Sequence, residues 1–264
     1  MTLGEVLRGA TDYLERKGVD SPRLDAELLL AHALGLTRIE LYTQHDRPVS
    51  DTERAAARAL VERRGRREPL AYILGEWGFR GLTLRTDARA LVPRPETEIV
   101  VERSLARIAG VEHPRVVDVG TGSGAIALAI KAERPDARVV ATESSPDAIV
   151  LARENGERLG LEIELVETNL LDGIEGPLDL VVSNPPYVLP HETLPPELAY
   201  EPRDALVDRG QTLALIAQAR RVLDGWLVLE VHEEHAQEVA AACGGAVSKD
   251  LAGRDRVVEA RWTP

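Results

Sequence analysis

The 264-residue sequence is poor in cysteine, methionine and aromatic residues. Its single cysteine, Cys243, excludes an intramolecular disulfide and any metal site built from several cysteines. No hydrophobic run approaches the roughly 18 residues that a transmembrane helix needs. The opening residues, Met1–Arg8, are amphipathic and carry an early acid, unlike a secretory signal peptide. These absences favour a cytoplasmic protein.

Positive charge is also in short supply. The chain has 32 basic and 44 acidic residues, a net charge of −12, which makes it a poor general binder of nucleic acid or anionic membranes. Its 44% hydrophobic and 29% charged residues are typical of a globular protein. Residues 1–75 hold 12 of the basic and 12 of the acidic residues, so the acidic excess lies in residues 76–264. This asymmetry suggests two parts with different roles.

The first part is predicted to be helical. Leucines and a valine recur at helical spacing near the start, Ser21-Pro22 is typical of a helix start, and Gly35 of a helix end. Residues 51–67 predict a third helix. We therefore expect a helical domain over residues 1–75, followed by a hairpin or linker over 76–93. Trp77 and Phe79 are expected to pack into a core or hinge, the alternative being contact with a substrate or cofactor.

The remainder, residues 94–264, is predicted to be one α/β domain. A helix is expected after Pro93-Arg-Pro-Glu96, and strands and helices then alternate. The expected strands lie at 116–119, 139–142, 163–166, 178–182 and 226–231, and the helices at 126–132, 146–159 and 212–223. Such alternation predicts a mostly parallel sheet covered by helices on both faces.

A glycine-rich loop joins the first of these strands to its helix. The loop runs through Gly120, Thr121, Gly122, Ser123 and Gly124. Glycines allow a sharp turn and a close approach of ligand to backbone, and the helix start can bind a carboxylate or phosphate. Glu143 ends the next strand, where an acid could bind ribose hydroxyls. This pattern fits NAD or S-adenosylmethionine, or a tight turn beside a surface carboxylate.

A second candidate site follows the apolar strand at 178–182. It consists of Asn184, Pro185, Pro186 and Tyr187. The prolines end the strand and stiffen the backbone, Asn184 adds a side-chain acceptor, and Tyr187 adds a flat face. Two fixed acceptors can hold the hydrogens of a planar amino group and aim its nitrogen at an electrophile. The alternative is a proline-rich turn that only ends a strand.

These motifs and four others make the sequence similar, nearly end to end, to the protein-(glutamine-N5) methyltransferase family, which modifies peptide chain release factors. The further similar segments are Ser21–His32, Glu68–Ile73, Pro93–Glu98 and Asp250–Arg256. The glycine loop is common to many methyltransferases, and enzymes that methylate base amino groups share the Asn-Pro-Pro-Tyr segment. The linker and C-terminal motifs are more specific to this family.

The resemblance implies a seven-stranded Rossmann-like methyltransferase domain and a small N-terminal helical domain that helps to bind the release factor. It implies that the substrate is the glutamine of a Gly-Gly-Gln loop and that S-adenosyl-L-methionine lies along Gly120–Gly124. Glu143, where the family more often has Asp, would bind the ribose, and Asn169 falls where an acid near the adenine is common. Asn184–Tyr187 would hold the glutamine amide, with Asn184 also beside the cofactor.

We therefore predict an S-adenosylmethionine-dependent amide methyltransferase that is a monomer, needs no metal, and recognises neither nucleic acid nor membrane directly. The alternatives are a nucleic-acid amino-group methyltransferase and a cofactor-sensing module without catalysis.

The roles of two further features stay open at this point. The basic cluster Arg63–Arg67 could contact the release factor or ribosomal RNA, or could be a solvated helix end. Glu96 and Thr97 could approach the cofactor or cap a helix.

Overall fold

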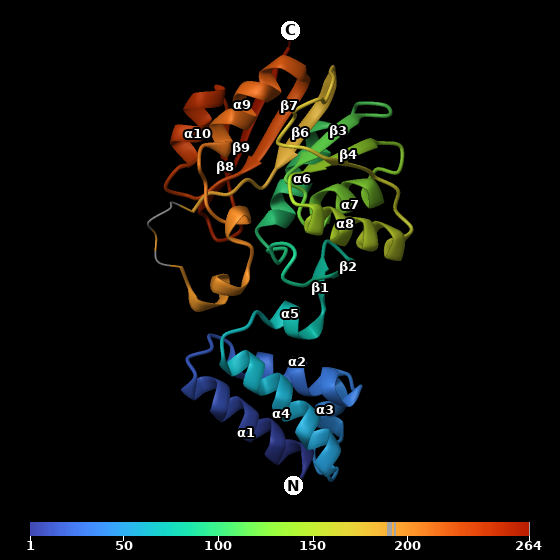
Figure 1. Ribbon diagram of the computed structural model, residues 1–264, viewed down its shortest axis with the longest axis vertical. Coiled ribbons are helices and arrows are strands. Elements are labelled where there is room, and N and C mark those ends of the chain that lie inside the picture. Colours follow the sequence, from blue (N-terminus) through green and yellow to red (C-terminus); the bar gives the residue numbers. More distant parts are fainter. Residues whose placement is uncertain (189–191, 193, 264) are drawn as a thin grey trace. The chain divides into compact units, whose positions relative to one another are not determined.

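The computed structural model describes residues 1–188, 192 and 194–263 and divides into two compact units (Figure 1). The first unit contains Met1–Gly75 together with Leu194–Tyr200, and the second contains the rest of the described chain from Glu76 onward. Residues 76–93, expected as a linker, thus belong to the second unit, and residues 194–200, expected in the catalytic domain, belong to the first. Within the described residues, no helix is long and apolar enough to cross a membrane.

Helices make up the first unit. They are α1 (Leu3–Arg16), α2 (Pro22–Leu34), α3 (Arg38–Thr43), α4 (Asp51–Gly65), α5 (Leu70–Leu74) and the 3-10 turn η1 (Pro196–Tyr200). α2 begins at Pro22 and ends before Gly35, which has a φ of 63°, as predicted. Helices α3 and α5 were not predicted, because six and five residues are too few for a clear periodic pattern.

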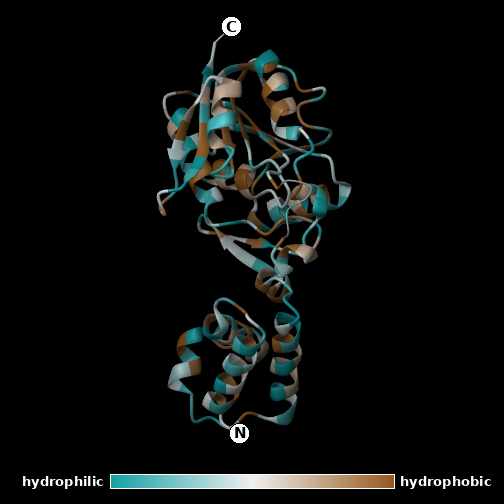
Figure 2. Cartoon of the chain, turned by 90° about the vertical axis from the view of Figure 1, so that its left-hand side faces the viewer, coloured by the Kyte–Doolittle hydropathy of each residue, from teal (hydrophilic) through white to brown (hydrophobic). Residues whose placement is uncertain are grey.

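Capping and burial together explain why these helices form. Thr2, Thr37 and Ser50 each accept a hydrogen bond from a backbone N–H three residues later, and the glutamate there bonds back to the cap. Hydrophobic and hydrophilic bands alternate along the helices (Figure 2). The hydrophobic side chains meet in one core, in which Leu14 and Leu29 are fully buried.

The predicted basic cluster proves to be largely structural. The Arg64 guanidinium donates to Asp25 at 2.6 Å, and both side chains are only 8% exposed. Glu197, in η1, accepts from Arg64 at 3.2 Å and from Arg67 at 2.6 Å. Burial raises the pKa of Asp25, although the Arg64 hydrogen bond opposes that shift. The interpretation of the cluster as a solvated helix end is therefore wrong for Arg64, because its side chain is buried and forms an ion pair.

The second unit is an α/β domain with a small hairpin. The hairpin consists of β1 (Glu76–Phe79) and β2 (Leu82–Arg85). The helices are α6 (Thr97–Arg107), α7 (Ala125–Glu133), α8 (Pro146–Leu159), α9 (Gln211–Val222) and α10 (Ala236–Cys243), with a 3-10 turn η2 (Arg203–Ala205). The strands are β3 (Arg115–Val119), β4 (Arg138–Glu143), β5 (Glu164–Glu167), β6 (Leu178–Ser183), β7 (Leu223–Glu230), β8 (Ala246–Lys249) and β9 (Asp255–Trp262).

These seven strands form one mostly parallel sheet, which confirms the predicted fold class. Among the described residues its order is β5-β4-β3-β6-β7-β9-β8. The first five strands in that order are parallel, whereas β9 runs antiparallel to both β7 and β8. The strands and helices expected between residues 115 and 231 are present, and α10, β8 and β9 were not predicted.

Successive side chains of the central strands point alternately into two hydrophobic cores. Val116 and Leu180 face the core that α6 and α7 cover, where Phe79 of the hairpin is also buried, as expected. Val117 and Val181, one residue later in each strand, face the core beneath α9 and α10. Figure 1 shows these helix groups on opposite sides of the sheet. Both faces are therefore covered, which explains the nearly continuous apolar runs of β3 and β6.

The buried ion pair of the first unit predicts a large, site-specific loss of stability. Arg64→Met removes one partner and leaves the Asp25 carboxylate buried without its guanidinium, which typically costs about 3–5 kcal/mol. Arg54→Met is the matched control, because Arg54 pairs with Asp51 at the surface and such pairs contribute about 0–1 kcal/mol. Urea denaturation followed by circular dichroism measures both variants. Equal stability of the two variants would contradict this assignment.

Candidate active site

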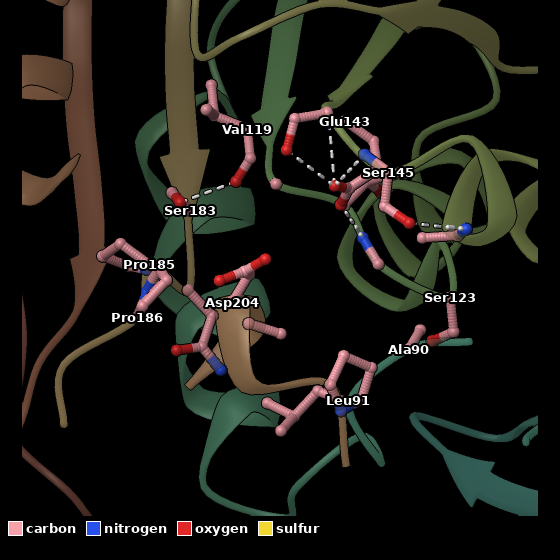
Figure 3. Close-up of a pocket in the computed structure, with 18 of the residues that line it drawn as sticks. Ala90, Leu91, Val119, Ser123, Glu143, Ser145, Ser183, Pro185, Pro186 and Asp204 are labelled. Carbon is pink, nitrogen blue, oxygen red and sulfur yellow. Dashed lines mark hydrogen bonds between the residues drawn. The ribbon is translucent and has the colours of Figure 1, made fainter. Parts of the chain in front are cut away.

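A cavity of about 590 Å³ opens at the carboxyl ends of the parallel strands (Figure 3). Ligands of open α/β sheets bind at this edge, where neighbouring strands deliver their loops side by side. The loops after β3, β4, β5 and β6 all reach the cavity, and segments before α6 and around η2 complete its wall. The lining residues include 89–94, Thr97, 119–123, Ala125, Ile126, 143–145, Ala148, 168–170, 183–186, 202–205, Arg209 and Gln211.

The structure brings most of the predicted site residues together in this cavity. Gly120, Thr121, Gly122, Ser123, Glu143, Asn169, Asn184, Pro185 and Pro186 all line it. Gly124 and Tyr187 do not belong to the lining: Gly124 is the N-cap of α7, and the Tyr187 ring lies 6.0 Å from the His232 ring. Asn169 sits in the loop after β5, as its position in the sequence suggested.

The glycine loop is anchored to β4 and needs its glycines for conformation. The backbone N–H groups of Gly120 and Thr121 both donate to the Thr142 carbonyl, at 2.8 and 3.0 Å. Gly122 has a φ of 56°, in the left-handed region that a β-branched residue avoids. Gly124 also has a positive φ, and a Cβ there would lie 3.0 Å from the Leu128 side chain. The loop therefore passes tightly over α7 and presents bare backbone to the cavity.

Glu143 holds the glycine loop as well as facing the cavity. Its carboxylate accepts from the Gly122 N–H at 3.0 Å, and from the Ser144 and Ser145 N–H groups at 2.8 and 3.0 Å (Figure 3). Glu143 is half-buried and bonded to the turn, and its role toward a ribose stays a prediction. Oε1 also accepts from the Ser144 hydroxyl at 3.5 Å, whereas Oε2 accepts only the Gly122 bond among the described residues and keeps one lone pair for a ligand.

Asp118 fixes the turn from below. It is fully buried, and its Oδ2 accepts from the Thr121 hydroxyl at 2.6 Å and from the Ala127 N–H at 3.1 Å. Among the described residues, its other oxygen has no hydrogen-bond partner. Burial raises the pKa of Asp118 to about 7, against the effect of these two hydrogen bonds. The end of β3 and the start of α7 are thus joined through one carboxyl group.

Asn184 enters the cavity from the end of β6 and has two side-chain neighbours behind it. The Ser183 hydroxyl donates to the Val119 carbonyl at 2.6 Å, which fastens β6 to β3 just before the tetrapeptide (Figure 3). The Asn184 Nδ2 donates to the Thr97 hydroxyl at 3.3 Å, and that hydroxyl bonds the Glu230 carboxylate at 2.7 Å. Thr97 therefore neither caps α6 nor stands at the surface, because the side chain is buried and bonded to β7.

Two parts of the wall had no signal in the sequence. The chain after the tetrapeptide returns at residues 206–208, where Val188 exchanges backbone hydrogen bonds with Leu206 and Asp208, and η2 then lines the cavity. Glu201, also buried, accepts from the Val92 N–H at 3.0 Å and from Arg94, which holds the segment before α6. These partners lie about a hundred residues apart in sequence, so no local pattern marks them.

This arrangement defines a class of protein. A sheet with an antiparallel seventh strand, a glycine loop after its first strand and an Asn-Pro-Pro-Tyr segment at the same edge characterise Rossmann-like methyltransferases. Residues 97–241 match the family model described as methyltransferase small domain, and residues 5–75 match that described as PrmC N-terminal domain. A methyltransferase from Pyrococcus furiosus, 20% identical with a TM-score of 0.51 over 68% of this chain and 88% of that one, has a similar fold.

Full-length relatives define the family more closely. The release factor glutamine methyltransferase of Deinococcus radiodurans is 43% identical over 274 residues, covering 99% of each chain. That of Geobacter sulfurreducens is 41% identical over 276 residues, covering 98% of this chain and 96% of its own. The chain belongs to the release factor glutamine methyltransferase family, as its motifs predicted.

The raised pKa of Asp118 predicts a pH dependence of stability. The folded state keeps a proton up to about pH 7 that the unfolded state releases near pH 4, so this group's contribution falls as pH rises through that window. Asp118→Asn has no titrating group there. Relative to this variant, the wild type should lose on the order of 2–4 kcal/mol of unfolding free energy between pH 4 and pH 8. Urea midpoints at both pH values measure this difference, and a constant difference would contradict the assignment.

Proposed function

We propose that this protein transfers a methyl group from S-adenosyl-L-methionine to the side-chain amide nitrogen of the glutamine in the Gly-Gly-Gln loop of peptide chain release factors. The observation that carries the proposal is the position of Asn184 and Pro185 in the same cavity as the glycine loop. A methyl donor along that loop and an amide held by the tetrapeptide would then share one enclosed space. Membership of the release factor glutamine methyltransferase family supports this substrate.

The cavity suits the methyl donor. Its volume of about 590 Å³ is in the range of small-molecule sites. Ala125 and Ile126, in the first turn of α7, line it, and first-turn amides lack partners within the helix and favour a carboxylate. Glu143 keeps one lone pair for a ribose hydroxyl, and Asn169 offers a polar contact for the adenine. S-adenosyl-L-methionine would supply an electrophilic methyl group on a sulfonium.

The tetrapeptide supplies orientation rather than a base. An amide nitrogen is not basic, so it reacts only when its two hydrogens are held and its remaining electron density is aimed. The Asn184 side-chain oxygen would accept one hydrogen, and the Pro185 carbonyl the other. Pro186 contributes no N–H that could compete for these acceptors, and Tyr187 would contribute its ring beside the amide. Fixed acceptors of this kind stabilise charge that develops on the amide during transfer.

The first unit is proposed to recognise the release factor. Residues 5–75 match the PrmC N-terminal domain model, and their balanced charge distinguishes them from the acidic second unit. This role leaves the chemistry to the second unit, within which the whole cavity lies. A cytoplasmic location goes with a substrate that acts on the ribosome, and the proposal invokes residues of one chain only, as a monomer would provide.

Methylation of defined substrates tests the proposal directly. The protein with labelled S-adenosyl-L-methionine should label a release factor and should not label the same factor with Ala in place of the loop glutamine. DNA and RNA serve as the competing substrates, because other enzymes use Asn-Pro-Pro-Tyr on base amino groups. Label in nucleic acid, or in the Ala-substituted factor, would overturn the assignment of substrate.

Asn184 variants test the clamp. Asn184→Ala removes one acceptor and leaves a substrate N–H without its partner in the protein, so turnover should fall at least about a hundredfold. Asn184→Asp keeps an acceptor but adds negative charge, and should also lose most activity. Affinity for S-adenosyl-L-methionine, measured by calorimetry, should change little in both variants. Near-normal turnover of the alanine variant would leave the tetrapeptide as a strand terminator only.

A further inference from the structure

Three side chains form a hydrogen-bonded row that begins in the cavity wall and ends behind it. Asn184 follows β6, Thr97 begins α6, and Glu230 ends β7. The Asn184 Nδ2 lies 3.3 Å from the Thr97 Oγ1, which lies 2.7 Å from the Glu230 Oε2. Thr97 is 4% exposed and Glu230 1% exposed, so both are shielded from bulk solvent. Thr97 and Asn184 line the cavity, whereas Glu230 stands behind them.

The direction of this row follows from the number of hydrogens available. A threonine hydroxyl has one hydrogen, and an ionised carboxylate can only accept. Thr97 therefore donates to Glu230, and the hydroxyl oxygen presents its lone pairs to Asn184. Only the NH2 end of the Asn184 amide can satisfy those lone pairs. The amide oxygen is then the end that remains for the cavity.

From this geometry we infer that Thr97 and Glu230 are positioning residues that lock the Asn184 side chain with its oxygen toward the substrate amide. The inference rests on the proposed function, in which that oxygen accepts a glutamine N–H. An asparagine amide turned by 180° would place its own NH2 group against the substrate N–H that the oxygen should accept. The lock therefore decides whether Asn184 accepts or repels the group to be methylated.

The surroundings of Glu230 make this lock sensitive to pH. Burial raises the pKa of Glu230 to about 7, and Glu96 raises it further, whereas the Thr97 hydrogen bond, Arg256 and Arg94 lower it. Tyr187 also faces the carboxylate, and burial followed by Glu230 raises the pKa of its hydroxyl. A protonated Glu230 can donate to Thr97, which frees the hydroxyl hydrogen to face Asn184 and favours the flipped amide. The active orientation is therefore the high-pH form.

Substitution of Thr97 separates orientation from packing. Thr97→Val keeps the shape and removes the hydroxyl, so kcat should fall about tenfold to a hundredfold, with the KM for the release factor and the affinity for S-adenosyl-L-methionine little changed. Thr97→Ser restores the hydroxyl and should recover most of the lost kcat. Thr212→Val is the matched control, since Thr212 is another buried threonine in the first turn of a helix, α9, and does not line the cavity.

The pH profile provides a readout that a purely structural role would not move. In the wild type and in Thr97→Ser, kcat should rise with pH through an inflection near 7 as Glu230 ionises. Thr97→Val breaks the row, so this inflection should disappear. Glu230→Gln removes the titrating group and should remove the inflection too. The double variant with Thr97→Val and Glu230→Gln should have a kcat no lower than that of the slower single variant, because the two residues act as a unit.

The outcomes distinguish this inference from the proposed function. If Asn184→Ala is impaired but Thr97→Val keeps wild-type kcat and the same pH inflection, the positioning role is overturned while the clamp stands. If Asn184→Ala itself turns over normally, the clamp fails and the positioning role fails with it. A loss of kcat in Thr97→Val that Thr97→Ser does not recover would assign the effect to packing and would also overturn the inference.

Discussion

The candidate active site depends on the parallel pairing of β3 with β4 and β6. The register places Val119 beside Thr142 on one side and Ser183 on the other, so the three strands end at one level. Glu143 is the last residue of β4, and the glycine loop and Asn184 directly follow β3 and β6. The Ser183 hydroxyl and the Thr142 carbonyl then fasten the loops across the strand gaps. A one-residue slip of β6 would turn Ser183 to the other face and carry Asn184 out of the cavity.

Carboxylates fix the shape of this edge, and they account for part of the acidic excess of the second unit. Asp118 joins β3 to α7, Glu143 holds the glycine loop, Glu201 holds the segment before α6, and Glu230 bonds Thr97. Each accepts from a backbone N–H or a hydroxyl. A carboxylate suits such work because one side chain can accept several hydrogen bonds in a directed arrangement. Part of the acidic excess of the second unit therefore has a structural role at this edge of the sheet.

Local chemistry was enough to predict much of this molecule from its sequence. Pro22 and Gly35 mark the ends of α2 because a proline in the first turn and a left-handed C-cap depend on neighbouring residues alone, although the Ser21 hydroxyl makes no capping hydrogen bond. The apolar runs of β3 and β6 and the loops after them were found for the same reason. In contrast, β9 was missed because Arg256 and Glu259 interrupt its apolar pattern. Both are buried in the structure, and Glu259 is paired with Arg103 and Arg107 of α6.

The same limit explains what was missed in and near the site. Arg64 looked like a solvated charge, and Glu230 gave no sign of its role, because a sequence does not show which distant residue will pair with an ionisable side chain. Their partners, Asp25 for Arg64 and Thr97 for Glu230, lie far away along the chain. Whether an ionisable group is buried depends on the whole assembled fold. The consequence of that burial, a fixed hydrogen-bond direction, acts only on the neighbouring side chains.

A fixed hydrogen-bond direction matters more in this site than in an enzyme that relies on a general base. Amide methylation relies on alignment of an unreactive nitrogen, and misplacement by about 1 Å can cost a hundredfold in rate. An asparagine whose two ends differ only in hydrogen-bonding sense cannot supply alignment by shape alone. Its orientation must be imposed by a neighbour with a defined direction, and a hydroxyl tied to a carboxylate has one. Methylation of an amide thus requires order in two sets of polar residues. The residues that position the clamp must be as well ordered as the residues that touch the amide.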